Sequence, residues 1–159
     1  MLNLHVSIKD QTLKVLDGEK IIKCYNVSTA KNGPGEDFGS EKTPRGLHQV
    51  RAKIGADCEE GAVFRARRPT GEVFTAELKA SQPERDWILT RIFWLSGLEV
   101  GKNRLGSKDT MRRYVYIHGT PPDVDMGYPG SKGCIRMNNK EIIELFNLIP
   151  VQTKVLIVE

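Results

Sequence analysis

The chain has 159 residues, with 24 Lys and Arg against 20 Asp and Glu, a net charge of +4, and 39% hydrophobic residues. This composition excludes a wholly disordered chain, and the small, dispersed charge excess predicts no nucleic-acid partner. No apolar run approaches the roughly 18–20 residues of a membrane helix, so we expect no membrane insertion. The length is typical of one domain, which we expect to span residues 1–159.

The start of the chain and its cysteines indicate in which cellular compartment the protein is expected. The first thirty residues carry charges throughout and lack the apolar stretch of about 7–15 residues that a secretory signal needs. Cys24, Cys58 and Cys134 form an odd set without paired spacing, which is unlike a disulfide framework. We therefore expect a cytoplasmic protein, with the periplasm as the alternative.

In the first half of the chain, the pattern predicts short strands. Residues 2–8 alternate apolar and polar, Leu13 and Val15 continue the alternation, and Asp17-Gly18 suits a tight hairpin turn before a third strand at 21–27. Residues 30–46 contain four glycines and two prolines and predict a long loop. Alternation resumes at 50–54, and short apolar segments at 62–66 and 73–76 flank a predicted turn at 69–71.

In the second half, residues 88–95 are β-branched and aromatic between breakers, which favours a strand over a helix. A strand at 114–117 ends at His118-Gly119, and a last strand covers 155–157. One helix is clear: Asn138 or Asn139 caps it, apolar residues recur at helical spacing to Ile149, and Pro150 ends it. We predict a mostly β fold with minor α, a β-sandwich or barrel with one helix near the C-terminus.

His118 and Cys134 are the candidates for chemistry. They lie sixteen residues apart, separated by a Gly- and Pro-rich loop that can fold back and bring them together. A thiol with a pKa near 8.5 needs a base or positive surroundings to act as a nucleophile. His118 is suited to be that base, Lys132 and the helix dipole to favour the thiolate, and the Gly133 and Cys134 amides to form an oxyanion hole. On spacing alone, a surface histidine and a buried structural cysteine remain an alternative.

A resemblance favours the catalytic interpretation. His-Gly at 118–119 followed by Ser-Lys-Gly-Cys-Ile-Arg at 131–136 closely resembles the signature of the L,D-transpeptidase catalytic domain, or YkuD domain. Residues 3–33 and the Thr-Pro-Arg-Gly at 43–46 resemble further parts of that family. The resemblance implies that Cys134 is the nucleophile, that His118 is its base and that the Gly119 carbonyl orients the histidine ring. It also implies an acyl-donor site lined by Ser131, Gly133 and Arg136; Lys132 stands there where the family usually has His and retains a cation.

By this resemblance, the chain acts on the L,D bond of peptidoglycan stem tetrapeptides through a Cys134 acyl-enzyme, with no cofactor and no metal. Carbapenems are expected to acylate the same thiol. A cytoplasmic location favours an L,D-carboxypeptidase that releases D-alanine in peptidoglycan recycling. The alternative is an L,D-transpeptidase that forms crosslinks or exchanges terminal D-amino acids in the cell wall.

Other interpretations remain open or are disfavoured. A catalytically silent peptide binder and a redox-sensing thiol protein are the other classes. A zinc site is disfavoured because no paired Cys or His spacing supports it; its members would be His48, Cys58, His118 and Cys134. Several further residues are expected to be structural or solvated: Cys24 in the core, Cys58 incidental in a polar loop, and His5 and His48 structural or exposed. Asp123, Asp125 and the arginine pairs 67–68 and 112–113 are expected on the surface. The alternative for the arginines is that they attract substrate carboxylates.

Overall fold

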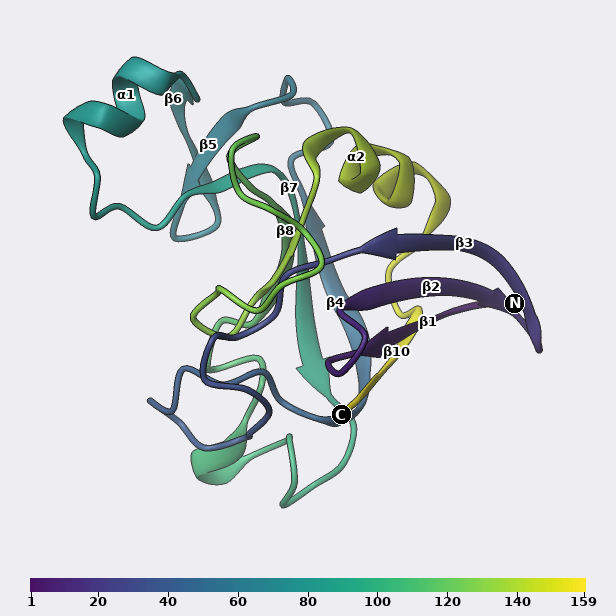
Figure 1. The fold of residues 1–159 in the computed structure, drawn as a ribbon. Coiled ribbons are helices and arrows are strands. Elements are labelled where there is room, and N and C mark those ends of the chain that lie inside the picture. Colours follow the sequence, from purple (N-terminus) through teal and green to yellow (C-terminus); the bar gives the residue numbers. More distant parts are fainter.

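The computed structural model describes residues 1–159 and confirms the mostly β fold with minor α. Ten strands form one sheet in the order β3-β2-β1-β10-β4-β7-β5-β6, with β8 pairing with β7 and β9 pairing with β8 (Figure 1). Their bounds are β1 (Leu2–Ser7), β2 (Thr12–Asp17), β3 (Lys20–Asn26), β4 (Gly46–Ile54), β5 (Ala62–Arg65), β6 (Arg68–Val73), β7 (Ile88–Gly97), β8 (Tyr116–Gly119), β9 (Ile135–Met137) and β10 (Lys154–Val158). The helices are α1 (Ala76–Ser81), α2 (Asn139–Leu148) and a 3₁₀ turn, η1 (Gly106–Lys108).

The two ends of the chain meet inside the sheet. β1 pairs antiparallel with β2 and parallel with β10, so that Leu4 lies opposite Val155 and Val6 opposite Ile157. The predicted hairpin turn joins β2 to β3, where Gly18 adopts a positive φ of 62° that glycine tolerates without steric cost. This pairing fixes the N-terminal strands to the last strand of the chain.

The main core lies between this part of the sheet and α2. Twenty buried hydrophobic residues form one cluster; they come from β1, β2, β3, β4, β7, β8, β9, β10, α2 and residues adjoining these elements. Asn138 caps α2 by accepting hydrogen bonds from the Lys140 and Glu141 amides at 2.9 and 3.3 Å, and Phe146 of α2 packs against Phe93 of β7 at 5.5 Å. The core thereby anchors β7, β8 and β9, which carry the candidate site.

The β5–β6 region differs from the prediction. The chain turns at Ala66-Arg67 and not at residues 69–71, which belong to β6. Both turn residues adopt positive φ, 48° and 63°, a conformation unusual for residues other than glycine, so their side chains gave no turn signal. The short helix α1 was also missed because none of its residues is buried and no apolar periodicity marks it.

Two further predictions are corrected by burial. Cys24 is exposed and not in the core, because β3 is an edge strand that turns Tyr25 inward and Cys24 outward. Strand β8 begins at Tyr116 and includes His118 and Gly119, whereas Tyr114 lies in a turn with a φ of 56°. His48, in contrast, is structural as expected: it is fully buried in β4.

None of the helices in the structure is both long and apolar enough to cross a membrane.

Candidate active site

Strands β8 and β9 bring the candidate catalytic residues to one face of the sheet. Their parallel pairing sets Ile117 opposite Ile135 on the core side and His118 opposite Arg136 on the other. Cys134 comes directly before β9, and its sulfur accepts a hydrogen bond from the Tyr116 amide at 3.3 Å. Because side chains two apart on a strand share a face, the Cys134 thiol and the His118 ring lie on the same side. Both line the same pocket.

The ring of His118 is held in one tautomer. It is 1% exposed, and its Nδ1 lies 2.6 Å from the Gly119 carbonyl oxygen. A carbonyl can only accept, so Nδ1 carries the proton and Nε2 has a free lone pair. Burial lowers the pKa of His118, against the opposing effect of the Gly119 hydrogen bond. The ring is therefore a neutral base at neutral pH, oriented as the resemblance implied.

Gly119 is closely packed against Asn139 and Leu89. A Cβ at this position would lie 2.3 Å from Asn139 Oδ1 and 2.6 Å from the Leu89 carbonyl oxygen, so only glycine fits. Asn139 Oδ1 accepts a hydrogen bond from the Thr90 hydroxyl at 2.7 Å, and Thr90 has a φ of 74° at an irregular step of β7. Sequence reasoning gave neither residue a role in the site and named Asn139 only as a candidate helix cap, because neither belongs to a chemical motif and a strained Thr leaves no signal in the pattern.

The Cys134 thiol is protonated at rest. Its side chain is partly buried, and its Sγ lies 3.5 Å from the Tyr114 carbonyl oxygen. Burial raises the pKa of Cys134 to about 12, although the Tyr116 amide, Arg136 and Arg113 act in the other direction. The dipole of α2 favours the Cys134 thiolate less than expected, because β9 separates Cys134 from the start of α2. The structure therefore holds a neutral thiol beside a neutral imidazole.

The loop before Cys134 is fixed by its own hydrogen bonds. The Ser131 hydroxyl donates to the Cys134 carbonyl at 2.5 Å and accepts from the Gly133 amide at 3.2 Å. Thr43, from the Thr-Pro-Arg-Gly segment, donates to the Gly133 carbonyl at 2.9 Å. The predicted oxyanion hole is thus not preformed at Gly133, because its amide already has a partner.

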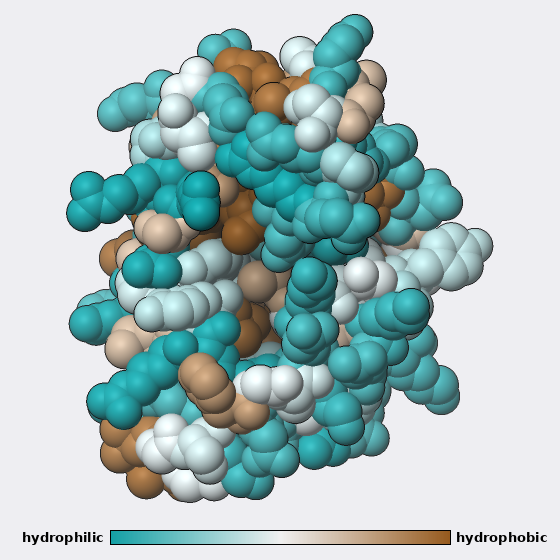
Figure 2. Space-filling model, turned by 90° about the vertical axis from the view of Figure 1, so that its left-hand side faces the viewer, coloured by the Kyte–Doolittle hydropathy of each residue, from teal (hydrophilic) through white to brown (hydrophobic).

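A pocket of about 410 Å³, with both charged and apolar side chains in its wall, surrounds the thiol. The predicted substrate-binding residues Ser131, Lys132 and Arg136 all line it. Arg67 and Arg113 also line it and are only partly exposed, so the prediction that these arginines are merely solvated is wrong for one member of each pair. The side of the molecule that carries α1 and the β5–β6 hairpin is largely hydrophilic, with small recessed apolar patches near its middle (Figure 2).

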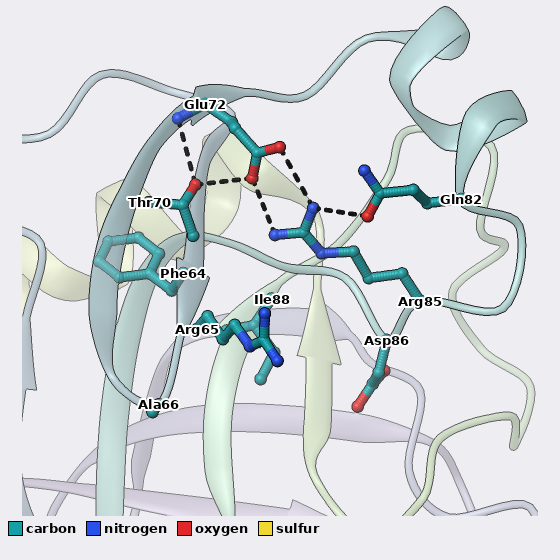
Figure 3. Close-up of a pocket in the computed structure, with 9 residues that line it drawn as sticks. All are labelled: Phe64, Arg65, Ala66, Thr70, Glu72, Gln82, Arg85, Asp86 and Ile88. Atoms are coloured by element: carbon teal, nitrogen blue, oxygen red, sulfur yellow. Dashed lines mark hydrogen bonds and ion pairs between the residues drawn. The ribbon is translucent and has the colours of Figure 1, made fainter.

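A second cavity of about 690 Å³ adjoins the thiol pocket and shares Ala66, Asp86 and Ile88 with it. On its rim, Arg85 forms an ion pair with Glu72 at 2.8 Å, and Thr70 and Gln82 complete the network (Figure 3). Asp86 stands at the junction and pairs with Arg136 at 3.5 Å. The two cavities are therefore neighbours that share part of their walls.

The residues of the disfavoured zinc site are not assembled. Both ring nitrogens of His48 are engaged elsewhere, with the Gly46 carbonyl at 3.0 Å and the Thr110 hydroxyl at 2.9 Å. No group of three or more His, Cys, Asp or Glu side chains is placed to hold a metal ion. Asp123 is exposed and pairs with Lys79 at 2.7 Å, in keeping with a solvated position.

A mostly β scaffold that places a cysteine and an oriented, neutral histidine in one pocket has the arrangement of a cysteine-dependent enzyme. The family model for the L,D-transpeptidase catalytic domain, YkuD, matches residues 3–157. The chain belongs to this family, whose members are enzymes with cysteine catalysis.

Individual relatives agree with this assignment. The chain is 26% identical over 150 residues, 94% of its length, to the putative L,D-transpeptidase YkuD of Bacillus licheniformis, and 47% identical over 53 residues, 33% of its length, to the putative L,D-transpeptidase YqjB of Bacillus subtilis. Its fold resembles that of the L,D-transpeptidase LdtMt1 in complex with imipenem, with a TM-score of 0.58, 19% identity and 99% of this chain covered. The matches span 61%, 30% and 58% of those three chains, respectively.

Proposed function

We propose that this protein cleaves the L,D bond of peptidoglycan stem tetrapeptides through a Cys134 acyl-enzyme and acts as an L,D-carboxypeptidase that releases D-alanine. The observation that carries the proposal is the neutral pair of His118 and Cys134 in one pocket, with the His118 ring fixed by Gly119. The family supports the substrate class.

The mechanism follows from the protonation states. As Cys134 Sγ attacks the carbonyl carbon of the L-centre, His118 Nε2 takes the thiol proton. The tetrahedral intermediate then collapses, the C–N bond breaks, and the imidazolium donates that proton to the departing amine of D-alanine. In the second half, His118 removes a proton from water and hydroxide adds to the thioester. The C–S bond then breaks as the imidazolium returns that proton to sulfur, which releases the tripeptide acid and regenerates the thiol. No external oxidant or cofactor is needed.

Hydrolysis is supported by the access of water to the thiol. The side chain of Cys134 is only partly buried, and charged side chains make up much of the pocket wall. Water at about 55 M competes well with dilute amines unless a site excludes it. These charged side chains keep water in the mouth of the pocket, within reach of the exposed part of the Cys134 side chain.

Transpeptidation is the second candidate, and the adjoining cavity favours it. This cavity of about 690 Å³ shares Asp86 with the thiol pocket. Asp86 pairs with Arg136 at 3.5 Å, and its carboxylate is suited to attract an ammonium group as well. An acceptor amine held there could reach the acyl-enzyme in place of water. The products would be a crosslink or an exchanged terminal D-amino acid.

One experiment separates the two reactions. A defined disaccharide-tetrapeptide is incubated with the protein alone, with excess D-methionine, or with a second stem peptide, and the products are identified by mass spectrometry. Free tripeptide as the main product in all three reactions supports the carboxypeptidase. Exchange or dimer as the main product at modest acceptor concentration overturns it in favour of transpeptidation.

Carbapenem binding and location belong to the same proposal. The structure of LdtMt1 in complex with imipenem supports acylation of Cys134 by a carbapenem here, which a mass adduct on Cys134 would verify and an adduct on another residue would contradict. We further propose a cytoplasmic location, which three unpaired cysteines support. Cell fractionation tests it: recovery from the periplasm would restore wall crosslinking as the leading role.

A further inference from the structure

Arg67 is an immobilised cation in the thiol pocket. Its guanidinium lies over the rings of Trp94 and Tyr114, 4.5 and 4.6 Å from their centroids, and donates a hydrogen bond to the Tyr116 hydroxyl at 3.0 Å. The left-handed turn at Ala66-Arg67 brings it there. The ion pairs of the structure do not include Arg67, so its charge has no carboxylate partner. A guanidinium fixed on aromatic rings is already oriented to bind a planar anion.

The other charged side chains near Arg67 in the pocket wall are also positive. Arg113 bonds only to neutral acceptors, the strongest being the Lys42 carbonyl at 2.7 Å, and has no ion pair. Lys132 is exposed on the same pocket. The only carboxylate lining the pocket is Asp86, and it is paired with Arg136. The pocket therefore carries an excess of unpaired positive charge at the Arg67 side.

The position of His118 relative to Arg67 indicates which part of a bound substrate lies near Arg67. His118 pairs in register with Arg136, beside Asp86, whereas Arg67 bonds to Tyr116, which lies next to Cys134. The general acid must reach the departing amine, so the leaving amino acid extends toward His118. The acyl part of the donor then extends the other way, toward Arg67.

We propose that Arg67, supported by Arg113, binds a carboxylate on the acyl side of the donor peptide and selects acidic donors. This inference rests on the proposed function and names the donor chemistry that the site prefers. In a stem peptide, the carboxylate comes from one of two sources: the free α-carboxylate of a γ-linked D-glutamyl residue, or the carboxylate at the far end of the diamino acid. A guanidinium–carboxylate pair in this setting is typically bidentate and charge-assisted.

The test compares matched donors on matched variants. Wild type, Arg67→Gln, Arg67→Lys and Arg68→Gln are assayed for D-alanine release from four tetrapeptides: the free acid and three primary amides, at the D-glutamyl carboxylate, the diamino acid carboxylate and the C-terminus. Arg68→Gln is the control because it removes the same charge from the adjacent, exposed residue of the hairpin. Thermal melts show that each variant is folded.

We expect wild type to prefer the free acid over one acyl-side amide by about 10- to 100-fold in kcat/KM. Arg67→Gln loses that factor on the free acid and keeps the activity on that amide, Arg67→Lys is intermediate, and Arg68→Gln matches wild type. The acyl-side amide that shows the effect identifies the source of the carboxylate. An equal loss on all donors overturns the proposal in favour of a packing role, and loss of discrimination only at the C-terminal amide places the carboxylate on the leaving side and also overturns it.

Binding measurements distinguish a failure of this inference from a failure of the proposed function. The dissociation constants of the same donors are measured on Cys134→Ala with and without Arg67→Gln. If wild type releases no D-alanine from any donor, the proposed function fails. Tighter binding of the acid than of the acyl-side amide, lost in Arg67→Gln, would still support the carboxylate site, whereas equal binding of the two would overturn it.

Discussion

At the scale of single residues, catalysis depends on where one proton resides. Burial lowers the pKa of His118 and raises that of Cys134 to about 12, so the proton rests on sulfur and moves only during attack. We expect Cys134→Ala to abolish turnover with folding intact. His118→Ala should lower kcat/KM by roughly 10²–10⁴-fold, the usual contribution of a general base.

The pH profile of wild type gives an independent measure of the same pair. The proposed mechanism requires neutral His118, so kcat/KM should hold across neutral pH and fall on the acid side with a midpoint below about 6.5, the ordinary histidine value. Cys24→Ser and Cys58→Ser serve as controls that keep full activity. A profile that rises steeply with pH above 8 would mean that a free thiolate is the reacting species and would contradict the neutral pair.

Gly119 is the residue on which the orientation of the His118 ring depends. In Gly119→Ala, the new Cβ would collide with Asn139 Oδ1 and with the Leu89 backbone, which we expect to cost about 1–3 kcal/mol of stability and to displace the carbonyl that holds His118. Melting temperature and kcat/KM should both fall. Gly130→Ala is the control, because its Cβ would meet Ser28 Oγ at 3.5 Å and Arg136 Nη1 at 3.7 Å, both ordinary contacts. Equal effects in the two variants would refute the packing argument.

At the scale of elements, the two helices contribute differently to stability. Each has a side-chain N-cap: Asn138 on α2 and Thr75 on α1, whose hydroxyl accepts from the Leu78 amide at 3.0 Å. The α2 helix packs Ile142, Leu145 and Phe146 into the core, whereas α1 buries no residue. The contact of α1 with a hydrophobic cluster is made by the partly buried Leu78, so fraying of that helix leaves the main core intact.

We expect Asn138→Ala to lower the free energy of unfolding by about 1 kcal/mol, within the usual range for a lost N-cap. Thr75→Ala should leave it nearly unchanged, and urea unfolding of the two variants measures the difference. Equal losses in the free energy of unfolding would show that α1 unfolds together with the rest of the molecule.

The sequence predicted elements whose signals are local. The strand alternation at residues 2–8, the Asp17-Gly18 turn and the spacing of Ile142, Leu145 and Phe146 led to the right elements. The β5–β6 turn was misplaced because Ala66 and Arg67 adopt a left-handed conformation that only tertiary contacts impose. In the site, motif residues such as His118 and Cys134 were found, but Thr90, Asn139 and the two pocket arginines act through contacts distant in sequence.

At the scale of the whole molecule, stability depends on keeping two histidines neutral. His48 and His118 are 0% and 1% exposed. Burial lowers the pKa of His48 to about 4 and lowers that of His118. In the unfolded chain, a histidine takes up a proton near pH 6.5. Below that pH, the unfolded state binds protons that the folded state does not, so stability is full above about pH 6.5 and is lost as the pH falls toward the folded-state values.

For His48 alone, a pKa lowered from 6.5 to about 4 corresponds to roughly 3 kcal/mol of stability lost on acidification. We expect the free energy of unfolding in urea to decline between about pH 6.5 and 4 in wild type and to decline less steeply in His48→Gln. The glutamine amide can still donate to the Gly46 carbonyl and accept from Thr110, but it takes up no proton. His5→Gln, at a partly exposed position of β1, controls for the substitution itself. A His48→Gln curve parallel to that of wild type would show that His48 does not titrate with unfolding, even if the variant is less stable at every pH.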